Sequence, residues 1–380
     1  MAHIFYGMSG EGRGHATRGR AVIEALRTQH QVTLFTSDCA YAMLEPLYRG
    51  TDVRVVEIPG LHFEYGPHGQ VDIPRTLTSA LRFRMAAKRY VEAVLPEFER
   101  TPPDLVIADF EPIIPRAARA CGLPFVSFDH QHYLVVNDLS ALPWTLRQKV
   151  AATAPFVKGL YDWQSRTIVS SFFAPPLKPA HRDAIQVGVL IRPEILRVRA
   201  ERGRHILAYM RRFAPPDMMA ALTASGREVR VYGLGERASE GRLKFLPIDE
   251  RRFLEDLATC DAVVSTAGNQ LVGEALALRK PLLVMPEAQN FEQLINAFFL
   301  EQSGAGWAER KRLTPERLGA FLEATEALRA RIRPELVCGN QAALTALTAE
   351  LDRRQPRMDE AAAAASARPV RAKVSGLEWV

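Results

Sequence analysis

The first segment with residue types suited to chemistry is a glycine-rich loop between an apolar run and a helical stretch. It reads Gly7-Met-Ser-Gly10-Glu-Gly12-Arg-Gly14-His15. Four glycines let backbone N–H groups approach an anion closely, and the N-terminus of the following helix adds a favourable dipole. The spacing is neither the dinucleotide fingerprint nor a Walker A loop, because Arg13-Gly14 stands where Lys-Ser/Thr is required. We expect Gly12 and Gly14 to border a bound phosphate; a tight strand-to-helix turn is the simpler alternative.

His15 ends this loop, on the side where a ligand would lie. An imidazole, with an ordinary pKa of about 6.5, can accept a proton from a hydroxyl group. Asp109 directly follows the apolar run DLVIA and can orient His15 and stabilise its charged form. Two alternatives stay open: Asp109 caps the helix that begins near Pro112, or Glu111 takes the orienting role.

A second group of polar and small residues follows the apolar run at 262–265. Gly268 and Asn269 open a helix whose N–H groups form a site suited to a diphosphate. Glu274 lies about one and a half turns further on, within reach of a ribose diol.

A third group follows the next apolar run, PLLVM. Asn290 and Gln293 have the spacing of a capping box, which is a structural interpretation. Glu292 and Gln293 also begin a helix directed at the same region, where sugar hydroxyls need polar partners.

These groups need elements that bring them together, and the hydrophobic pattern supplies them. Short apolar runs alternate with helical stretches, which is typical of an α/β fold with doubly wound parallel sheets. Ligands of such sheets bind beyond the carboxyl ends of the strands. Strands are expected at 2–6, 32–35, 53–58, 105–108, 125–128, 205–209, 228–232, 243–246, 262–265 and 281–284. Helices are expected at about 15–27, 41–48, 74–99, 112–121, 215–225, 250–259, 270–278 and 291–302.

The length of 380 residues suits two domains rather than one core. A proline-rich segment without periodicity, SFFAPPLKPAHR, predicts a linker at 171–182. We expect a first Rossmann-like domain at 1–170 and a second at 183–330, facing one another across a cleft. Helices at 331–352 are expected to pack back on the first domain, and 353–380 is expected to be a poorly ordered tail.

The composition limits which binding partners and which cellular compartment we expect. The 49 basic residues exceed the 43 acidic ones by only six, too few to indicate a nucleic-acid-binding protein. The four cysteines stand singly, and the N-terminus has no signal-peptide pattern, so we expect a cytoplasmic protein. No Asp-x-Asp occurs, so the usual carboxylate pair for a metal ion on a diphosphate is missing, and we expect no metal. We also expect no cofactor.

The stretch DAVVSTAGNQLVGEALALRKPLLVMPEAQNFEQLINAFFLEQSGAG (261–306) closely resembles the donor-binding segment of nucleotide-sugar glycosyltransferases of the GT-B fold. The GEGRGH loop is similar to that of the UDP-N-acetylglucosamine transferase of peptidoglycan synthesis, and to UDP-glycosyl- and glucuronosyltransferases. Weaker similarities at 103–131, 186–195 and 243–268 fall in the same order, so the resemblance covers roughly residues 1–350.

The resemblance implies an inverting, metal-independent hexosyl transfer from a nucleoside-diphosphate sugar, with UDP the expected nucleotide. It implies His15 as base with Asp109, the diphosphate at Gly268 and Asn269, the ribose at Glu274, and the sugar at Glu292 and Gln293. The uracil would lie near 245–248. Thr266-Ala267-Gly268 replaces the family's His-Gly-Gly, and Arg211 or Arg212 stands where relatives have glycine or serine. Arg211 is expected to supply the lost phosphate charge, and the alternative is that an arginine there blocks the usual pose of the donor.

The acceptor is the open question. An aromatic loop at 60–70 and the helix after Pro74, with Arg75, Arg82 and Arg89 on one face, are candidates to meet it. Nearby apolar residues Leu77, Leu81, Phe83 and Met85 suit contact with an anionic membrane and a lipid-linked or small lipophilic acceptor, although a solvated amphipathic helix is the simpler interpretation. His130 and His132 are further candidates for the acceptor pocket. Two other functions remain: a nucleotide-sugar 2-epimerase or hydrolase, and a non-catalytic nucleotide-binding subunit.

Overall fold

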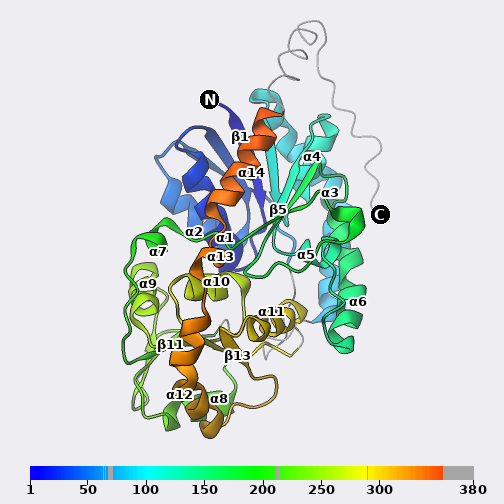
Figure 1. Ribbon diagram of the computed structural model, residues 1–380. Helices are drawn as coiled ribbons and strands as arrows, with labels where there is room; N and C mark the ends of the chain where they lie inside the picture. The colour runs from blue at the N-terminus through cyan, green and yellow to red at the C-terminus, as the bar shows by residue number, and fades with distance from the viewer. Residues whose placement is uncertain (63, 65, 67–71, 211–213, 289, 354–380) are drawn as a thin grey trace, which may run out of the picture.

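The alternating apolar and amphipathic segments fold into two parallel sheets with helices around them, one domain above the other in Figure 1. The computed structural model describes the chain except for residues 63, 65, 67–71, 211–213, 289 and 354–380. The expected tail at 353–380 therefore lies almost wholly outside the described residues.

The first domain is built on a sheet of seven parallel strands. Its strands are β1 (His3–Met8), β2 (Gln31–Thr36), β3 (Val53–Glu57), β4 (Leu105–Asp109), β5 (Val126–Asp129), β6 (Arg166–Ser170) and β7 (Ile185–Val187). Its helices are α1 (Arg13–Leu26), α2 (Asp38–Tyr48), α3 (Ile73–Arg100), α4 (Ile113–Ala120), α5 (Tyr133–Val136) and α6 (Trp144–Leu160), with a 3₁₀ turn at Pro179–His181.

The second domain has six parallel strands. They are β8 (Ile206–Tyr209), β9 (Val229–Tyr232), β10 (Leu243–Leu246), β11 (Ala262–Ser265), β12 (Leu282–Val284) and β13 (Gly306–Ala308). The remaining helices are α7 (Pro193–Arg197), α8 (Pro216–Ala224), α9 (Glu250–Thr259), α10 (Asn269–Ala277), α11 (Phe291–Gln302), α12 (Pro315–Arg331), α13 (Pro334–Val337) and α14 (Asn340–Asp352).

Strand order explains where the candidate residues meet. The order is β3-β2-β1-β4-β5-β6-β7 in the first sheet and β10-β9-β8-β11-β12-β13 in the second. Each sheet reverses its winding once, between β1 and β4 and between β8 and β11. At such a switch point the two following loops diverge, and ligands bind there. The glycine-rich loop and Asp109 flank the first switch point, and the turn at Gly268 follows β11 at the second.

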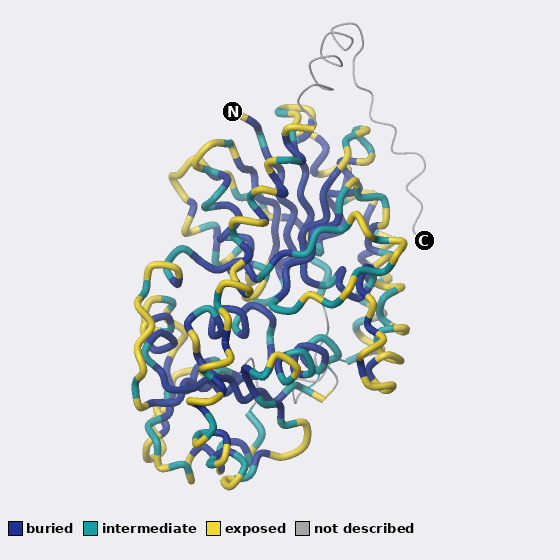
Figure 2. The backbone as a smooth tube through the Cα atoms, viewed as in Figure 1, coloured by how far each residue is buried: buried dark blue, intermediate teal, exposed yellow. Residues whose placement is uncertain are grey.

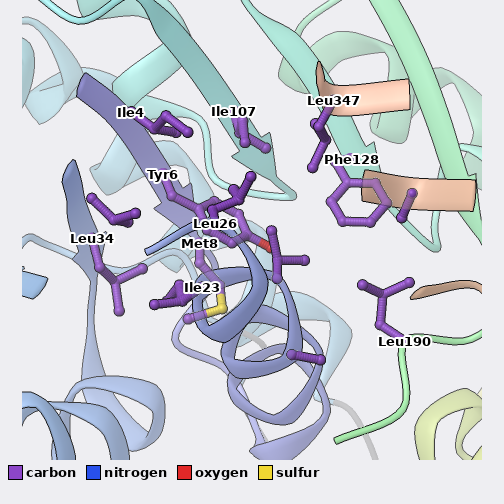
Figure 3. Close-up of a cluster of buried hydrophobic side chains, with 14 of the residues drawn as sticks. Ile4, Tyr6, Met8, Ile23, Leu26, Leu34, Ile107, Phe128, Leu190 and Leu347 are labelled. Carbon is purple, nitrogen blue, oxygen red and sulfur yellow. The ribbon is translucent and has the colours of Figure 1, made fainter. Parts of the chain in front are cut away.

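The strands form the buried centre of each domain (Figure 2). In the first domain, Tyr6 and Met8 of β1 pack against Ile23 and Leu26 of α1 (Figure 3). Each of these four side chains is buried, so α1 is fixed on the sheet along one face. The position of His15, in the first turn of α1, is therefore set by the core.

The boundary between the domains differs from the expected one. Segment 171–182 joins two strands of the same sheet, β6 and β7, so it is not an interdomain linker. The chain crosses to the second sheet after Val187. It returns beside its outward path, where Val189 N–H donates to Val337 O at 2.7 Å and Gly339 N–H donates to Val189 O at 2.9 Å.

After this return the last helix, α14, packs on the first domain. Ala343, Ala346, Leu347 and Leu351 join the core of the first sheet, and Figure 3 shows Leu347 beside Phe128 of β5. The two domains are therefore connected by two crossing segments. Among the described residues, no helix combines the length and the apolar character needed to cross a bilayer.

Candidate active site

His15 and Asp109 meet at the switch point of the first sheet. Gly12 caps α1 with φ 77° and ψ 172°, a conformation that glycine adopts without strain. His15 lies in the first turn, and its Nδ1 atom is 2.9 Å from Oδ1 of Asp109, the last residue of β4. Asp109 is fully buried, whereas the His15 side chain is 12% exposed. The carboxylate thus contacts the ring from inside while part of the ring stays accessible.

A buried cation holds the Asp109 carboxylate in place. Arg18 Nε donates to Asp109 Oδ2 at 2.9 Å, and its Nη2 donates to Oδ1. Tyr6 O–H lies 3.4 Å from Oδ2. Burial raises the pKa of Asp109, but the charges and hydrogen bonds of Arg18 and His15 outweigh burial and hold it below its ordinary value. Asp109 is therefore a carboxylate at neutral pH.

The turn after Asp109 has an unusual backbone. Phe110 has φ 54°, in the left-handed region that a bulky residue rarely adopts. Its N–H donates to the hydroxyl oxygen of Tyr161 at 3.1 Å, and that hydroxyl donates to Asp129 Oδ2 at 3.2 Å. The Phe110 ring is stacked on His15 with 6.3 Å between centroids. Tyr161 thus supports the strained residue that covers the histidine.

Glu111, the alternative candidate for orienting His15, does not contact the histidine and caps a helix instead. Its two carboxylate oxygens accept from Ile113 N–H at 2.6 Å and Ile114 N–H at 2.8 Å, so it caps α4. Burial raises the pKa of Glu111 to about 7, although these two N–H groups oppose the rise. The contacts therefore place Asp109 beside His15 and Glu111 at the helix end.

The four glycines of the first loop have separate explanations. A Cβ atom at Gly7 would lie 2.7 Å from Ile114, and one at Gly10 would lie 2.2 Å from Ser37 O, so both positions are closely packed. Gly12 needs its positive φ. A Cβ atom at Gly14 would meet nothing within 4 Å. Packing and backbone conformation thus account for three of these glycines, and the space beside Gly14 is open within the described part of the chain.

The second sheet places a helix N-terminus at its own switch point. Gly268 precedes α10. Within the described part of the chain, no side chain caps this helix, and a Cβ atom on Gly268 would meet nothing within 4 Å. Ala267 has φ 67°, and its carbonyl accepts from Asn296 Nδ2 at 2.9 Å. Among the residues that the structure describes, no side chain caps the first N–H groups of α10, as an anion site requires.

The Asn269 side chain is engaged with the first domain. Its Nδ2 donates to Ser170 O at 3.3 Å, and its Oδ1 accepts from Phe172 N–H at 3.4 Å. A phosphate contact at Asn269 would therefore use its backbone N–H group while the side chain connects the domains.

Glu274, the expected ribose ligand, is buried in an ion pair. Arg192 donates to both carboxylate oxygens, from Nε at 2.9 Å and from Nη2 at 2.8 Å. Gln270 Nε2 adds a third donor at 3.1 Å. A ribose contact at Glu274 therefore requires that Arg192 give up at least one of its hydrogen bonds.

This ion pair continues into the first domain. Arg192 Nη1 donates to Glu250 Oε1 at 2.7 Å, and Arg20 of α1 donates to the same oxygen at 2.7 Å. Arg20 also pairs with Glu194. A chain of charges thus links α1, which carries His15, to Glu274 on α10.

Glu292 and Gln293 lie in the first turn of α11, which Asn290 caps by accepting from Gln293 N–H at 3.2 Å. Gln293 Oε1 accepts from Glu287 N–H at 2.8 Å, so part of this side chain is engaged. Glu292 is 28% exposed and lies 3.9 Å from His130 Nε2. The structure thus places Glu292 at the junction between the domains, with its carboxylate toward β5.

The two histidines after β5 are buried. His130 Nε2 is 3.3 Å from Asn296 Oδ1, across the junction. His132 Nδ1 is 2.7 Å from Asp129 Oδ2, a second histidine–aspartate pair. Burial lowers the pKa of His130, while Asp129, despite its burial, is held at a pKa of about 2, chiefly by the charge of His132.

Several residues that the sequence assigned to the site are either not described by the structure or are buried. Arg211 and Arg212 lie outside the described residues, as does much of the loop at 60–70. Phe245, in the segment expected near uracil, is buried at β10 beneath the Arg237 guanidinium. Within the part of the chain that the structure describes, no group of three or more potential ligands is placed to hold a metal ion.

Sequence reasoning missed Arg18, Tyr161 and Arg192. Arg18 follows His15 by three residues, so helical spacing puts both on one face and was an available signal. Tyr161 and Arg192 lie far from their partners in the sequence and carry no such signal.

Comparison with known proteins identifies the family of the chain. The model of glycosyl transferase family 1 matches residues 2–325. An uncharacterized glycosyltransferase of Methanosarcina acetivorans is 24% identical over 377 residues, covering 90% of this chain and 93% of the relative. A second one, from Methanosarcina mazei, is 22% identical and covers 78% of this chain and 83% of the relative.

Solved structures share the fold at low identity. CalG4, the calicheamicin glycosyltransferase, has a TM-score of 0.63 and 17% identity, and the match covers 93% of this chain and 99% of that one. LpCGTa, solved in complex with UDP, also has a TM-score of 0.63, with 19% identity and coverages of 92% and 99%. Phytolacca americana UGT2, complexed with UDP-2fluoro-glucose and pterostilbene, has a TM-score of 0.67, with 12% identity and coverages of 93% and 100%.

Proposed function

The chain belongs to glycosyl transferase family 1 and has the GT-B fold, and on that premise we propose that it moves a hexose from a nucleoside-diphosphate sugar to an acceptor hydroxyl. The observation that carries the proposal is the contact of 2.9 Å between His15 and Asp109 at the switch point of the first sheet. UDP is the proposed nucleotide, supported by the solved relatives that contain UDP or UDP-sugars.

In the proposed step His15 is the general base. Its Nε2 atom takes the proton of the acceptor hydroxyl, whose oxygen forms a bond to the anomeric carbon. The bond from that carbon to the phosphate oxygen breaks, and the nucleoside diphosphate leaves with the electron pair. Attack from the face opposite the leaving group inverts the anomeric centre. Asp109 stabilises the resulting imidazolium, and base assistance contributes about 10²–10⁴-fold.

The donor is proposed to lie against α10 and α11. The uncapped N-terminus of α10, with the open side of Gly268, supports diphosphate binding and stabilisation of the leaving group. Gly12 and Gly14 are proposed to border the diphosphate from the side of the first domain. Arg211 would add positive charge beside the diphosphate. Glu274 is assigned to the ribose. Glu292 and Gln293 are assigned to the sugar, and the first of these is partly exposed at the junction.

Metal independence is part of the proposal and is supported by the sequence. The chain has no Asp-x-Asp pair of the kind that holds a divalent cation on a diphosphate. Helix N–H groups and arginine would neutralise the leaving group instead. Donor turnover in EDTA tests this directly, and loss of turnover that Mg²⁺ restores would overturn it.

The acceptor side is proposed to include α3. Leu81 is 59% exposed and Met85 is 79% exposed, four residues apart on one helix face, whereas Phe83 is buried in the core. Arg82, Lys88 and Arg89 are exposed around them. Exposed apolar side chains surrounded by basic residues are suited to binding the surface of an anionic bilayer, where a lipid-linked acceptor would be found.

One experiment separates the candidate functions. The protein is incubated with a panel of UDP- and dTDP-sugars, with and without a lipid extract, and both released nucleoside diphosphate and isomerised donor are measured. A transferase releases it only with acceptor present. Isomerisation of the donor, or release of nucleoside diphosphate without acceptor, would indicate an epimerase or a hydrolase. Nucleotide binding without turnover would indicate a non-catalytic subunit. If no donor is consumed and none raises the melting temperature, the proposal fails.

A further inference from the structure

Asn296 lies in the segment that resembles a donor-binding region, but it has no role in the proposed step. It belongs to α11, three residues after Gln293, and it is fully buried. Its Nδ2 atom donates to the carbonyl oxygen of Ala267 at 2.9 Å. The other end of the amide, Oδ1, lies 3.3 Å from Nε2 of His130 in the first domain. The amide is therefore held between the Gly268 turn and the first domain.

The carbonyl that Asn296 holds belongs to the peptide group that leads into this turn. The peptide bonds of the described chain are trans, and in a trans peptide group the C=O and N–H bonds point in opposite directions. Because the Ala267 oxygen faces the Asn296 amide, the N–H group of Gly268 points away from it. Gly268 is partly exposed, and no described backbone group accepts a hydrogen bond from its N–H. This N–H group is therefore available to an anion, next to the uncapped N–H groups of α10.

The backbone at Ala267 shows why this peptide group needs a partner. Ala267 is buried and has φ 67°, in the left-handed region that costs free energy in any residue with a Cβ atom. Rotation of the peptide group between Ala267 and Gly268 would exchange the positions of its oxygen and its N–H. A carbonyl oxygen, with its partial negative charge, would then occupy the side where the diphosphate is proposed to bind. The hydrogen bond from Asn296 Nδ2 stabilises the orientation that avoids this.

We propose that Asn296 is a positioning residue for the donor diphosphate: it fixes the Ala267–Gly268 peptide group so that an N–H group, and not a carbonyl oxygen, faces the phosphate. The inference rests on the proposed function, because it requires that the diphosphate bind at Gly268. The same helix thus carries Glu292 and Gln293, which are assigned to the sugar, and the residue that shapes the diphosphate site.

The test compares the dissociation constants of UDP and uridine in wild type and in N296L, measured by calorimetry and, for the weaker ligand, by NMR titration. Leucine is close to asparagine in shape but cannot donate to the Ala267 oxygen. Uridine has no phosphate groups, so the preference for UDP over uridine reports the phosphate contacts alone. We expect N296L to lower this preference by about tenfold or more, with uridine affinity nearly unchanged.

Two outcomes would overturn the inference: an N296L protein that keeps the wild-type preference, or one that loses affinity for UDP and uridine equally. A wild type that binds UDP no more tightly than uridine would instead overturn the proposed diphosphate site, and this inference with it. Failure of the proposed function and failure of the inference alone are therefore distinguishable. If N296L does not fold, N296A, a smaller side chain that also lacks the donor, carries the same prediction.

Asn137 provides the matched control. It is also a fully buried asparagine, and its Nδ2 atom donates to a backbone carbonyl, Pro175 O, at 2.7 Å within the first domain. N137L should lower the melting temperature, because it removes a comparable hydrogen bond, but it should leave the preference for UDP over uridine in place. A loss of preference in N137L equal to that in N296L would attribute the effect to general destabilisation and contradict the inference.

Discussion

The Nδ1 atom of His15 and the Oδ1 atom of Asp109 are 2.9 Å apart, although 94 residues separate them in the chain. The sheet explains the contact: β1 and β4 are neighbours in which Met8 is paired with Asp109, so their carboxyl ends coincide. Gly12 then turns the chain into α1 and returns His15 over the end of β4.

Asp109 should be needed for turnover but not for donor binding. In D109N the ring loses the carboxylate that stabilises its charged form, so kcat should fall by about 10²–10⁴-fold. The dissociation constant for UDP, measured by calorimetry, should change less than about threefold, because Asp109 is fully buried against His15 and Arg18 and is not assigned to the donor. A D109N enzyme with full kcat would show that His15 does not depend on this carboxylate.

Tyr161 should stabilise the turn that carries Phe110. In Y161F the Phe110 N–H group and Asp129 each lose one hydrogen bond, so the free energy of unfolding should fall by about 1–3 kcal/mol. The stacking of Phe110 on His15 should loosen as well, and kcat should fall more than KM rises. Y133F serves as the matched control, because it removes the hydroxyl of another buried tyrosine that makes no hydrogen bond within the described part of the chain. Unchanged stability and kcat in Y161F would mean that the hydroxyl does not hold the turn.

Glu111 predicts a specific dependence of stability on pH. Its pKa is raised from 4.5 to about 7 by burial, so between these values the folded protein binds more protons than the unfolded chain. Stability therefore falls as pH rises through this window, by up to about 3 kcal/mol. In E111Q this contribution is absent, so the difference in unfolding free energy between E111Q and wild type should move in favour of E111Q from pH 5 to pH 7. A constant difference across that range would contradict the prediction.

Glu274 can be tested as the ribose ligand. If its carboxylate binds the diol, wild type should bind UDP more tightly than 2′-deoxy-UDP, and E274Q should lose most of that preference. The competing structural role predicts something else. R192M leaves Glu274 buried and unpaired, so it should destabilise the protein by about 3–5 kcal/mol, and R192M/E274Q by less. If E274Q still binds UDP more tightly than 2′-deoxy-UDP, Glu274 does not bind the ribose and has a structural role only.

The features that the sequence predicted correctly are those that depend on residues close together in the chain. Strands such as Val32–Phe35 and the helix at Phe291–Gln302 were predicted within a few residues, because buried apolar runs and capping residues are local patterns. The glycine-rich loop and the Gly268 turn were also found locally. The position of Asp109 at the end of an apolar run was enough to suggest its meeting with His15.

The parts that were missed depend on long-range contacts. Strand β7 is three residues long and belongs to the first sheet only because it pairs with β6, so the prolines before it were taken for a linker. Arg192 pairs with Glu274 across 82 residues, and no pattern near either residue predicts that pair. Phe83 was grouped with exposed apolar residues, but it packs inward on the first sheet.

The central claim is that His15 is the base of an acceptor-dependent sugar transfer. Its most direct test is the single-turnover rate of nucleoside diphosphate release, with a donor and acceptor identified from the panel, in wild type and H15A. We predict acceptor-dependent release in wild type and a rate about 10²–10⁴-fold lower in H15A, with donor affinity unchanged. An H15A enzyme that turns over at the wild-type rate would contradict the account.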